Sequence, residues 1–98
     1  MRHALIAAAL AVAPAVTFAE ELPPGAQLAA SCGMCHGTAG RSTGGNESLA
    51  GMPKADIERK LEQFRSGTKP ATVMHQIAKG YSDAQVKLIA EYFSAQKK

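Results

Sequence analysis

Two thiols and an imidazole occur close together in this chain. Cys32 and Cys35 are its only cysteines, they stand three positions apart, and His36 directly follows the second. Such a group could form a disulfide, a redox dithiol, part of a zinc site or an attachment point for haem. A Cys32–Cys35 disulfide would close too short a loop to stabilise the fold much. A thioredoxin-type dithiol occurs in a fold with β-strands, which this sequence does not predict. A zinc site needs four ligands, and after Cys32, Cys35 and His36 only His75 remains.

Covalent haem attachment agrees best with this spacing. Two thiols three positions apart can reach the two vinyl groups of a porphyrin, and the histidine that follows can bind the iron. Cys-x-x-Cys-His is the c-type haem signature among cysteine spacings. We therefore predict one haem c, attached to Cys32 and Cys35, with His36 as an iron ligand.

A second iron ligand is expected from the other side of the haem. A low-spin electron carrier commonly uses methionine there, which also raises the reduction potential. Met34 lies between the two thiols, so it is expected on the same side of the haem as His36. Met52 precedes most of the chain that must pass round the haem edge to reach the other side. Met74 lies further along and is the favoured ligand; Met52, His75 or an open position are the alternatives, and Met74 could also simply fill the core.

The first nineteen residues have the pattern of a secretory signal peptide. A short positive start precedes an uncharged apolar run, and small residues precede the acidic pair Glu20–Glu21. The run is too short for a membrane span, so we predict a cleaved signal over 1–19 and a domain over 20–98; a retained N-terminal anchor is the alternative. The predicted location is the periplasm, with no membrane span in the mature form.

Apolar periodicity over the remaining chain predicts an all-α fold. Ile57, Leu61 and Phe64 form one stripe at helical spacing, and Gly67 follows as a C-cap would. Ser82 and Gln85 fit a capping box at the start of the last helix. No stretch shows sustained strand alternation. The expected helical segments are 25–36, a helix from Pro53 to Gly67, 71–80 and 83–96, with a glycine-rich loop over 37–46.

The composition indicates that the chain needs a large apolar group. It contains no tryptophan, three phenylalanines and two tyrosines, which is little material for the core of so small a domain. A haem would supply the missing apolar mass. The mild positive charge could assist docking to an acidic partner. No basic run with interleaved aromatic residues occurs, so a nucleic-acid partner is not expected.

The chain resembles class I c-type cytochromes over most of its length, from about Leu22 to Phe93. The similarity rests on CGMCHG and the glycine loop, and most specifically on FRSG, TVM, IAKGYSD and IAEYF. These last segments are similar to the haem subunits of flavocytochrome c sulfide dehydrogenase and to related small periplasmic cytochromes. The resemblance implies a small fold of helices around one haem, and Met74 as the second axial ligand.

The resemblance also implies particular contacts, and the chain departs from the pattern in two ways. Ala29 or Ala30 should meet Tyr92 or Phe93 where the terminal helices cross. Sulfide dehydrogenase haem subunits often hold two haem domains, whereas this chain has one attachment motif. Many class I cytochromes have a proline after the motif, near the carbonyl that accepts the axial histidine N–H; the stretch NESLAG has none.

The predicted function is single-electron transfer without catalysis. The chain would serve as the haem subunit or electron acceptor of a sulfide-oxidising flavoprotein, so the expected partner is a redox protein. A freely diffusing carrier between other respiratory enzymes is the main alternative. A haem-based ligand sensor or peroxidase would need an open or labile sixth position, which Met74 argues against.

Overall fold

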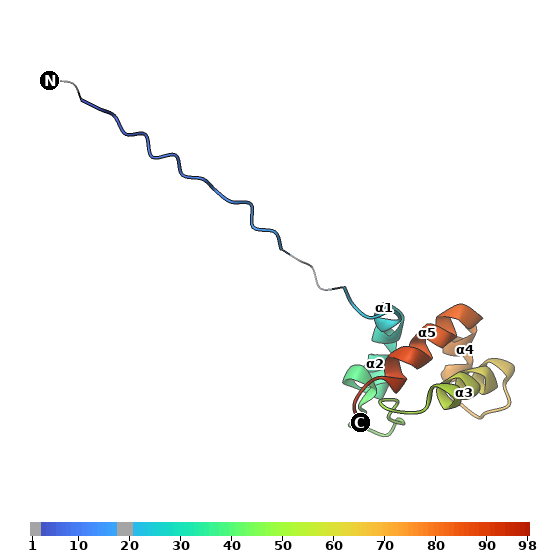
Figure 1. Ribbon diagram of the computed structural model, residues 1–98. Coiled ribbons are helices and arrows are strands. Elements are labelled where there is room, and N and C mark those ends of the chain that lie inside the picture. The colour runs from blue at the N-terminus through green and yellow to red at the C-terminus, as the bar shows by residue number, and fades with distance from the viewer. Residues whose placement is uncertain (1–2, 18–20) are drawn as a thin grey trace.

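The computed structural model describes residues 3–17 and 21–98. Residues 3–17 form neither helix nor strand and are exposed throughout (Figure 1). The predicted boundary between signal and domain, at residues 19 and 20, lies outside the described residues.

The rest of the described chain, from Ala26 to Ser94, is built from helices joined by turns and loops and contains no strand, as the sequence predicts. In chain order the elements are α1 Ala26–Ala29, the 3-10 turn η1 Ala30–Cys32, α2 Gly33–His36, the 3-10 turn η2 Thr38–Gly40, α3 Lys54–Ser66, α4 Met74–Lys79 and α5 Asp83–Ser94. The first three follow one another without a gap, so the helix expected over 25–36 is present with a 3-10 turn in its middle.

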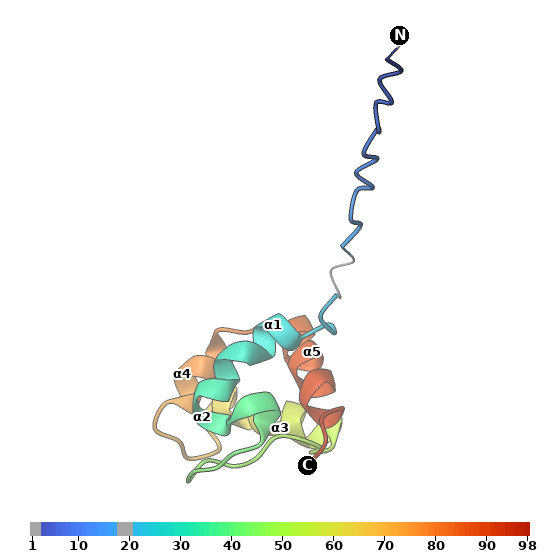
Figure 2. The same ribbon diagram turned by 90° about the vertical axis from the view of Figure 1, so that its left-hand side faces the viewer.

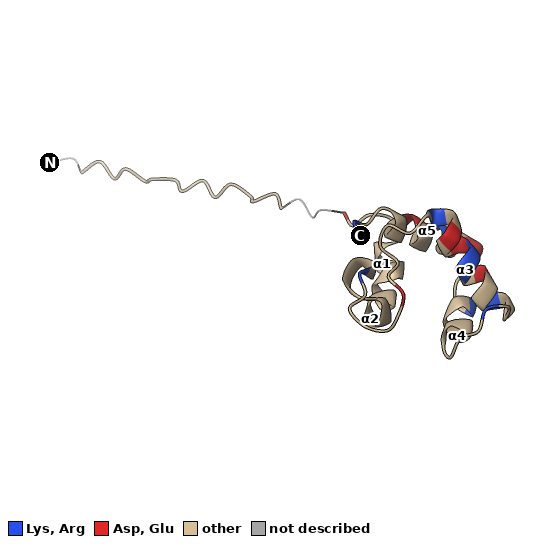
Figure 3. Ribbon diagram, turned by 90° about the horizontal axis from the view of Figure 1, so that it is seen from below, with Lys and Arg blue, Asp and Glu red and all other residues tan. Residues whose placement is uncertain are grey.

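Helices α3 and α5 connect the part of the domain that holds α1 and α2 with the part that holds α4. α3 packs against both α4 and α5, and α1 packs against α5. Seen from below, α1 and α2 form one arm and α4 the end of another, with α3 and α5 between them (Figure 3). The cysteine motif therefore lies on one arm and Met74 on the other.

The core is small and lies where α1, α3 and α5 meet. Its buried members are Ala29, Ile57, Ile89, Ala90 and Phe93. Phe93 is the only large side chain among the described residues that is less than 2% exposed. The resemblance implies a contact between Ala29 or Ala30 and Tyr92 or Phe93. Ala29 is buried in the same cluster as Phe93, whereas Ala30 is exposed.

Local signals in the sequence define the helix ends. Pro53 precedes α3, and Gly67 ends it in the left-handed conformation, with φ +81°. Ser82 and Gln85 form the expected capping box at the start of α5: the Ser82 hydroxyl accepts from the Gln85 N–H, and the Gln85 side chain accepts from the Ser82 N–H.

The segment over 71–80 is less helical than expected, because α4 begins only at Met74. Thr72 and Val73 precede it, and such β-branched residues lose side-chain freedom in a helix and form helices poorly. Pro70 also cannot continue a helical hydrogen-bond ladder. Met74 consequently stands at the first position of α4, directly after a bend at Thr72 and Val73.

Gly25 allows α1 to cross α5 closely. Its φ is +85°, and a Cβ at this position would lie 2.2 Å from the carbonyl oxygen of Leu88 in α5. That oxygen belongs to the helix backbone and has little freedom to move. Sequence analysis did not identify this position, because the approach depends on two segments more than sixty residues apart.

Gly25→Ala is expected to lower the free energy of unfolding by about 3 kcal/mol, because it adds left-handed strain to a backbone clash. Gly44→Ala is the matched control: a Cβ at Gly44 meets nothing within 4 Å, and its φ is not positive. Urea unfolding of both haem-loaded variants would measure the difference. Equal stabilities would contradict the close crossing of α1 and α5.

Candidate functional site

The cysteine motif occupies a continuous helical turn. Cys32 ends η1, and Cys35 and His36 end α2. At a spacing of three residues the two thiols lie on neighbouring positions of one helical face. The two cysteines do not form a disulfide with each other; Cys32 packs against the core, whereas Cys35 is exposed. Burial raises the pKa of Cys32 above its ordinary value. The motif thus offers two thiols and the imidazole from one rigid turn.

A backbone carbonyl fixes the orientation of the His36 ring. Nδ1 lies 2.6 Å from the carbonyl oxygen of Glu47. A carbonyl oxygen can only accept, so Nδ1 carries the proton and Nε2 keeps a lone pair for a metal. No sequence pattern marks this acceptor, since every residue carries a carbonyl and the loop contains no proline near it. The Glu47 carbonyl is thus the hydrogen-bond partner of the His36 ring.

His75 is engaged in a different hydrogen bond. Its Nε2 lies 2.6 Å from the carbonyl oxygen of Lys69, and its ring lies 6.3 Å from that of Phe64. Nε2 is therefore the protonated nitrogen and is not available as a ligand in this arrangement. The contact ties the start of α4 to the first half of the loop between α3 and α4.

The three methionines that could serve as ligands have different surroundings. Met74 is half-buried at the start of α4. Met52 packs against the core cluster, and Met34 is 90% exposed beside the thiols. Of the three, only Met74 lies on the arm opposite His36 (Figure 3). This arrangement supports Met74 as the second ligand.

Apolar side chains beside Met74 remain exposed. Val73 is 55% and Ile77 41% exposed, although both belong to the helical domain. Val73 directly precedes α4, and Ile77 lies three residues after Met74, on the same face of that helix. An apolar group between α4 and α2 would cover such residues. The small core, the exposed apolar residues and the donor set of two thiols, an imidazole and a thioether together fit a haem.

Tyr81 connects the two arms. Its hydroxyl lies 3.1 Å from Oγ of Ser31, the residue before the motif. Its carbonyl accepts from Arg65 at 2.8 Å, and the same guanidinium forms a 2.6 Å ion pair with Asp83. Arg65 thus fixes the turn between α4 and α5 against the end of α3. The arm that carries Met74 is therefore held at a defined position relative to the motif.

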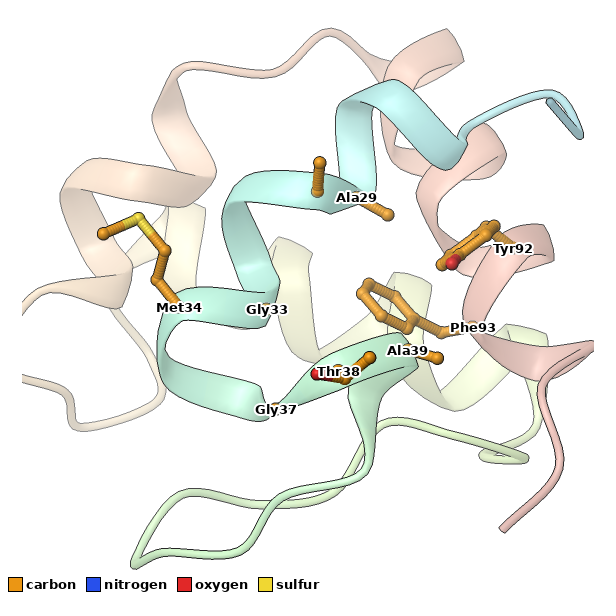
Figure 4. A pocket seen from close by; sticks show the side chains of 9 residues that line it. Ala29, Gly33, Met34, Gly37, Thr38, Ala39, Tyr92 and Phe93 are labelled. Carbon is orange, nitrogen blue, oxygen red and sulfur yellow. The ribbon is translucent and has the colours of Figure 1, made fainter.

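A shallow pocket lies at the crossing of α1 and α5, beside the cysteine motif. Ala29, Gly33, Met34 and Gly37 line one side of it, and Tyr92 and Phe93 the other (Figure 4). Its lining contains none of Cys32, Cys35, His36 and Met74. The pocket therefore borders the cysteine motif through Gly33, Met34 and Gly37 but includes neither a thiol nor a candidate iron ligand.

Comparison with known proteins agrees with this geometry. The cytochrome c family model matches residues 23–97. The cytochrome subunit of sulfide dehydrogenase from Chlorobaculum tepidum is 44% identical over 66 residues, which cover 67% of this chain and 60% of that protein. A thiosulfate dehydrogenase electron acceptor from Thiomonas intermedia is 40% identical over 68 residues, covering 67% of this chain and 31% of that protein. Cytochrome c-553 from Nitratidesulfovibrio vulgaris is 32% identical over 94 residues, covering 91% and 89%.

The chain belongs to the cytochrome c family. Proteins of this family transfer electrons and are not catalysts. The single pair formed by Cys32 and Cys35 implies one covalently attached haem c. The chain spans about three fifths of the sulfide dehydrogenase cytochrome subunit and about a third of the thiosulfate dehydrogenase electron acceptor named above.

Proposed function

We propose that this chain is a periplasmic mono-haem cytochrome that accepts single electrons from a sulfide-oxidising flavoprotein. Cys32 and Cys35 hold the haem by thioethers, and His36 and Met74 bind its iron. The observation that carries this assignment is the His36 ring, whose Nδ1 donates to the Glu47 carbonyl and whose Nε2 is left free for a metal. When bound, haem c stores and releases one electron by changing the oxidation state of its iron.

The residues of the chain limit how much the site changes during transfer. His36 is held by the Glu47 carbonyl, and α4 is held against α3 by packing and by the Arg65 contacts to Tyr81 and Asp83. Both proposed ligands thus stand on elements fixed by other contacts. Ligands that keep their positions need little rearrangement when the iron gains or loses an electron, which favours fast electron transfer. A ligand held in place also disfavours binding of an external molecule to the iron.

The proposed donor follows from the relatives. The Chlorobaculum protein is a cytochrome subunit of sulfide dehydrogenase, and the Thiomonas protein is an electron acceptor of thiosulfate dehydrogenase. Both names place similar chains at the electron outlet of an enzyme that oxidises a sulfur compound. A sulfide-oxidising flavoprotein is accordingly the proposed partner, and the periplasm, reached through the predicted signal, is the proposed location.

One observation favours a freely diffusing carrier as a second candidate. The similarity to cytochrome c-553 of Nitratidesulfovibrio vulgaris covers 89% of that protein, so the two chains are alike in extent as well as in sequence. Among the described residues, no helix has the length and apolar character needed to cross a membrane. The two candidates differ in whether the chain stays bound to a larger protein.

Sizing chromatography of native extract separates these candidates. Haem and flavin absorbance are recorded together, and this chain is identified in the fractions by mass spectrometry. We expect haem and flavin to elute together at a size well above that of the chain, and the complex to reduce its haem when sulfide is added. Haem that elutes alone, and that stays oxidised when sulfide is added to the whole extract, would contradict the flavoprotein partner.

A further inference from the structure

The carbonyl that accepts the His36 N–H lies in an unusual loop for this task. Residues 41–52, between η2 and α3, contain no proline, and Gly44 and Gly45 directly precede Asn46 and Glu47. Two glycines give the backbone many conformations and do not by themselves hold a carbonyl in place. In Figure 2 this loop runs beneath α2. Something other than local backbone stiffness must keep the Glu47 carbonyl at Nδ1.

The base of the loop is fixed by backbone hydrogen bonds. The N–H groups of Leu49 and Ala50 donate to the carbonyl of Gly40, at 2.8 and 3.1 Å. These bonds follow Glu47 by two and three residues. They set where the loop returns to the domain, but they do not act on Asn46 or on the side chain of Glu47.

Within the loop, the Ser48 hydroxyl accepts from the Ser42 N–H at 3.0 Å. Two further side-chain contacts tie the residues at the accepting carbonyl to neighbouring helices. The Asn46 side chain donates from Nδ2 to the carbonyl oxygen of Cys35, at 3.0 Å, and so ties the loop to the helix that carries His36. The Glu47 carboxylate forms an ion pair with the ammonium of Lys60, which lies on α3. The Lys60 side chain is 24% exposed, compared with 43% for Lys54 in its pair with Glu91, whereas the two glutamates, Glu47 and Glu91, are 51% and 52% exposed.

We propose that Asn46 and Lys60 are positioning residues for the axial histidine. Together they hold the Glu47 carbonyl against His36 Nδ1–H. The inference rests on the proposed ligation of iron by His36. A hydrogen bond at Nδ1–H raises the basicity of the ligating nitrogen. A more basic ligand stabilises the oxidised iron, so these two residues lower the reduction potential.

Variants of constant net charge separate positioning from simple electrostatics. Asn46→Ala removes one contact without changing charge. The double variant Glu47→Gln/Lys60→Met removes the ion pair and keeps the net charge, and Glu47→Lys/Lys60→Glu restores a pair with its charges exchanged. Lys54→Met/Glu91→Gln is the matched control, because it removes a lysine–glutamate pair that joins α3 to α5 away from the loop.

Two readouts report on the hydrogen bond itself. The first is solvent exchange of the His36 Nδ1 proton, followed by NMR of the reduced protein with 15N-labelled histidine; the second is the reduction potential. In Asn46→Ala and in Glu47→Gln/Lys60→Met, we expect exchange to become roughly fivefold to tenfold faster, the factor for losing one typical hydrogen bond, and the potential to rise. The charge-exchanged variant should return toward the parent values, and the control should match the parent.

The outcomes distinguish this proposal from the proposed function. If the parent protein lacks a single low-spin haem with histidine ligation, the proposed function itself fails. If the parent has that haem but Asn46→Ala and Glu47→Gln/Lys60→Met keep its exchange rate and potential, only the positioning role is overturned. A control variant that shifts as much as these variants would overturn it too. A charge-exchanged variant that stays at the values of Glu47→Gln/Lys60→Met would overturn the part assigned to Lys60.

Discussion

Replacing both Cys32 and Cys35 with alanine is expected to abolish covalent haem attachment. Each thiol would form one thioether, and the chain has no other cysteine. Without a bound haem the small core formed around Phe93 must stabilise the domain alone, which is difficult at this size. We therefore expect the double variant to be unfolded by circular dichroism. Mass spectrometry of the denatured chain should show the mass of the polypeptide without haem.

The single variants keep this prediction testable if the double variant is degraded in cells. Cys35→Ala and Cys32→Ala should each retain haem through the remaining thioether, at lower yield and with a visible spectrum shifted toward that of a haem with one free vinyl group. Met34→Ala is the matched control, because Met34 lies between the thiols and is 90% exposed. Haem that stays attached to the denatured double variant would contradict thioether attachment at these residues.

Met74→Ala is expected to convert a low-spin haem into a high-spin form that binds external ligands. The substitution removes the proposed thioether donor, and nearby His75 is held by the Lys69 carbonyl. Because a methionine ligand raises the potential, we expect a fall on the order of 0.1–0.2 V, a part of the roughly 0.8 V that axial ligands span. Optical spectra with and without added imidazole, together with potentiometry, would measure both effects.

Two further methionine variants test the assignment of the ligand. Met34→Ala should leave the spectrum and the potential unchanged. Met52→Ala should lower stability, because Met52 packs against the core cluster, while the haem stays low-spin. A high-spin Met52 variant beside a low-spin Met74 variant would transfer the ligand role to Met52. A low-spin Met74 variant with an unchanged potential would contradict the assignment directly.

Short-range patterns in the sequence were sufficient to predict most of the helices and their ends. The stripe of Ile57, Leu61 and Phe64 predicted α3, and Gly67 marked its end. Ser82 and Gln85 predicted the start of α5, down to both hydrogen bonds of the capping box. Each of these features depends on residues within one or two helical turns of one another. Such short-range patterns can be read without knowing how the chain folds back on itself.

Structural features that depend on contacts between residues far apart in the chain could not be predicted from the sequence. The close approach of Gly25 to Leu88 depends on how α1 crosses α5. The Glu47 carbonyl that accepts from His36 has no sequence signature, because its position depends on the path of the loop between η2 and α3. The sequence therefore predicted the residues that could hold a haem, and the structure supplied the groups that orient them.

The central claim is that one haem iron is bound by His36 and Met74. NMR of the reduced protein with 13C-labelled methionine methyl groups tests it most directly, because a methyl group bound over the haem is strongly shifted by the ring current. We predict one strongly shifted methyl, absent from Met74→Ala and present in Met34→Ala and Met52→Ala. No shifted methyl in the parent protein, or a shifted methyl that persists in Met74→Ala, would contradict the account.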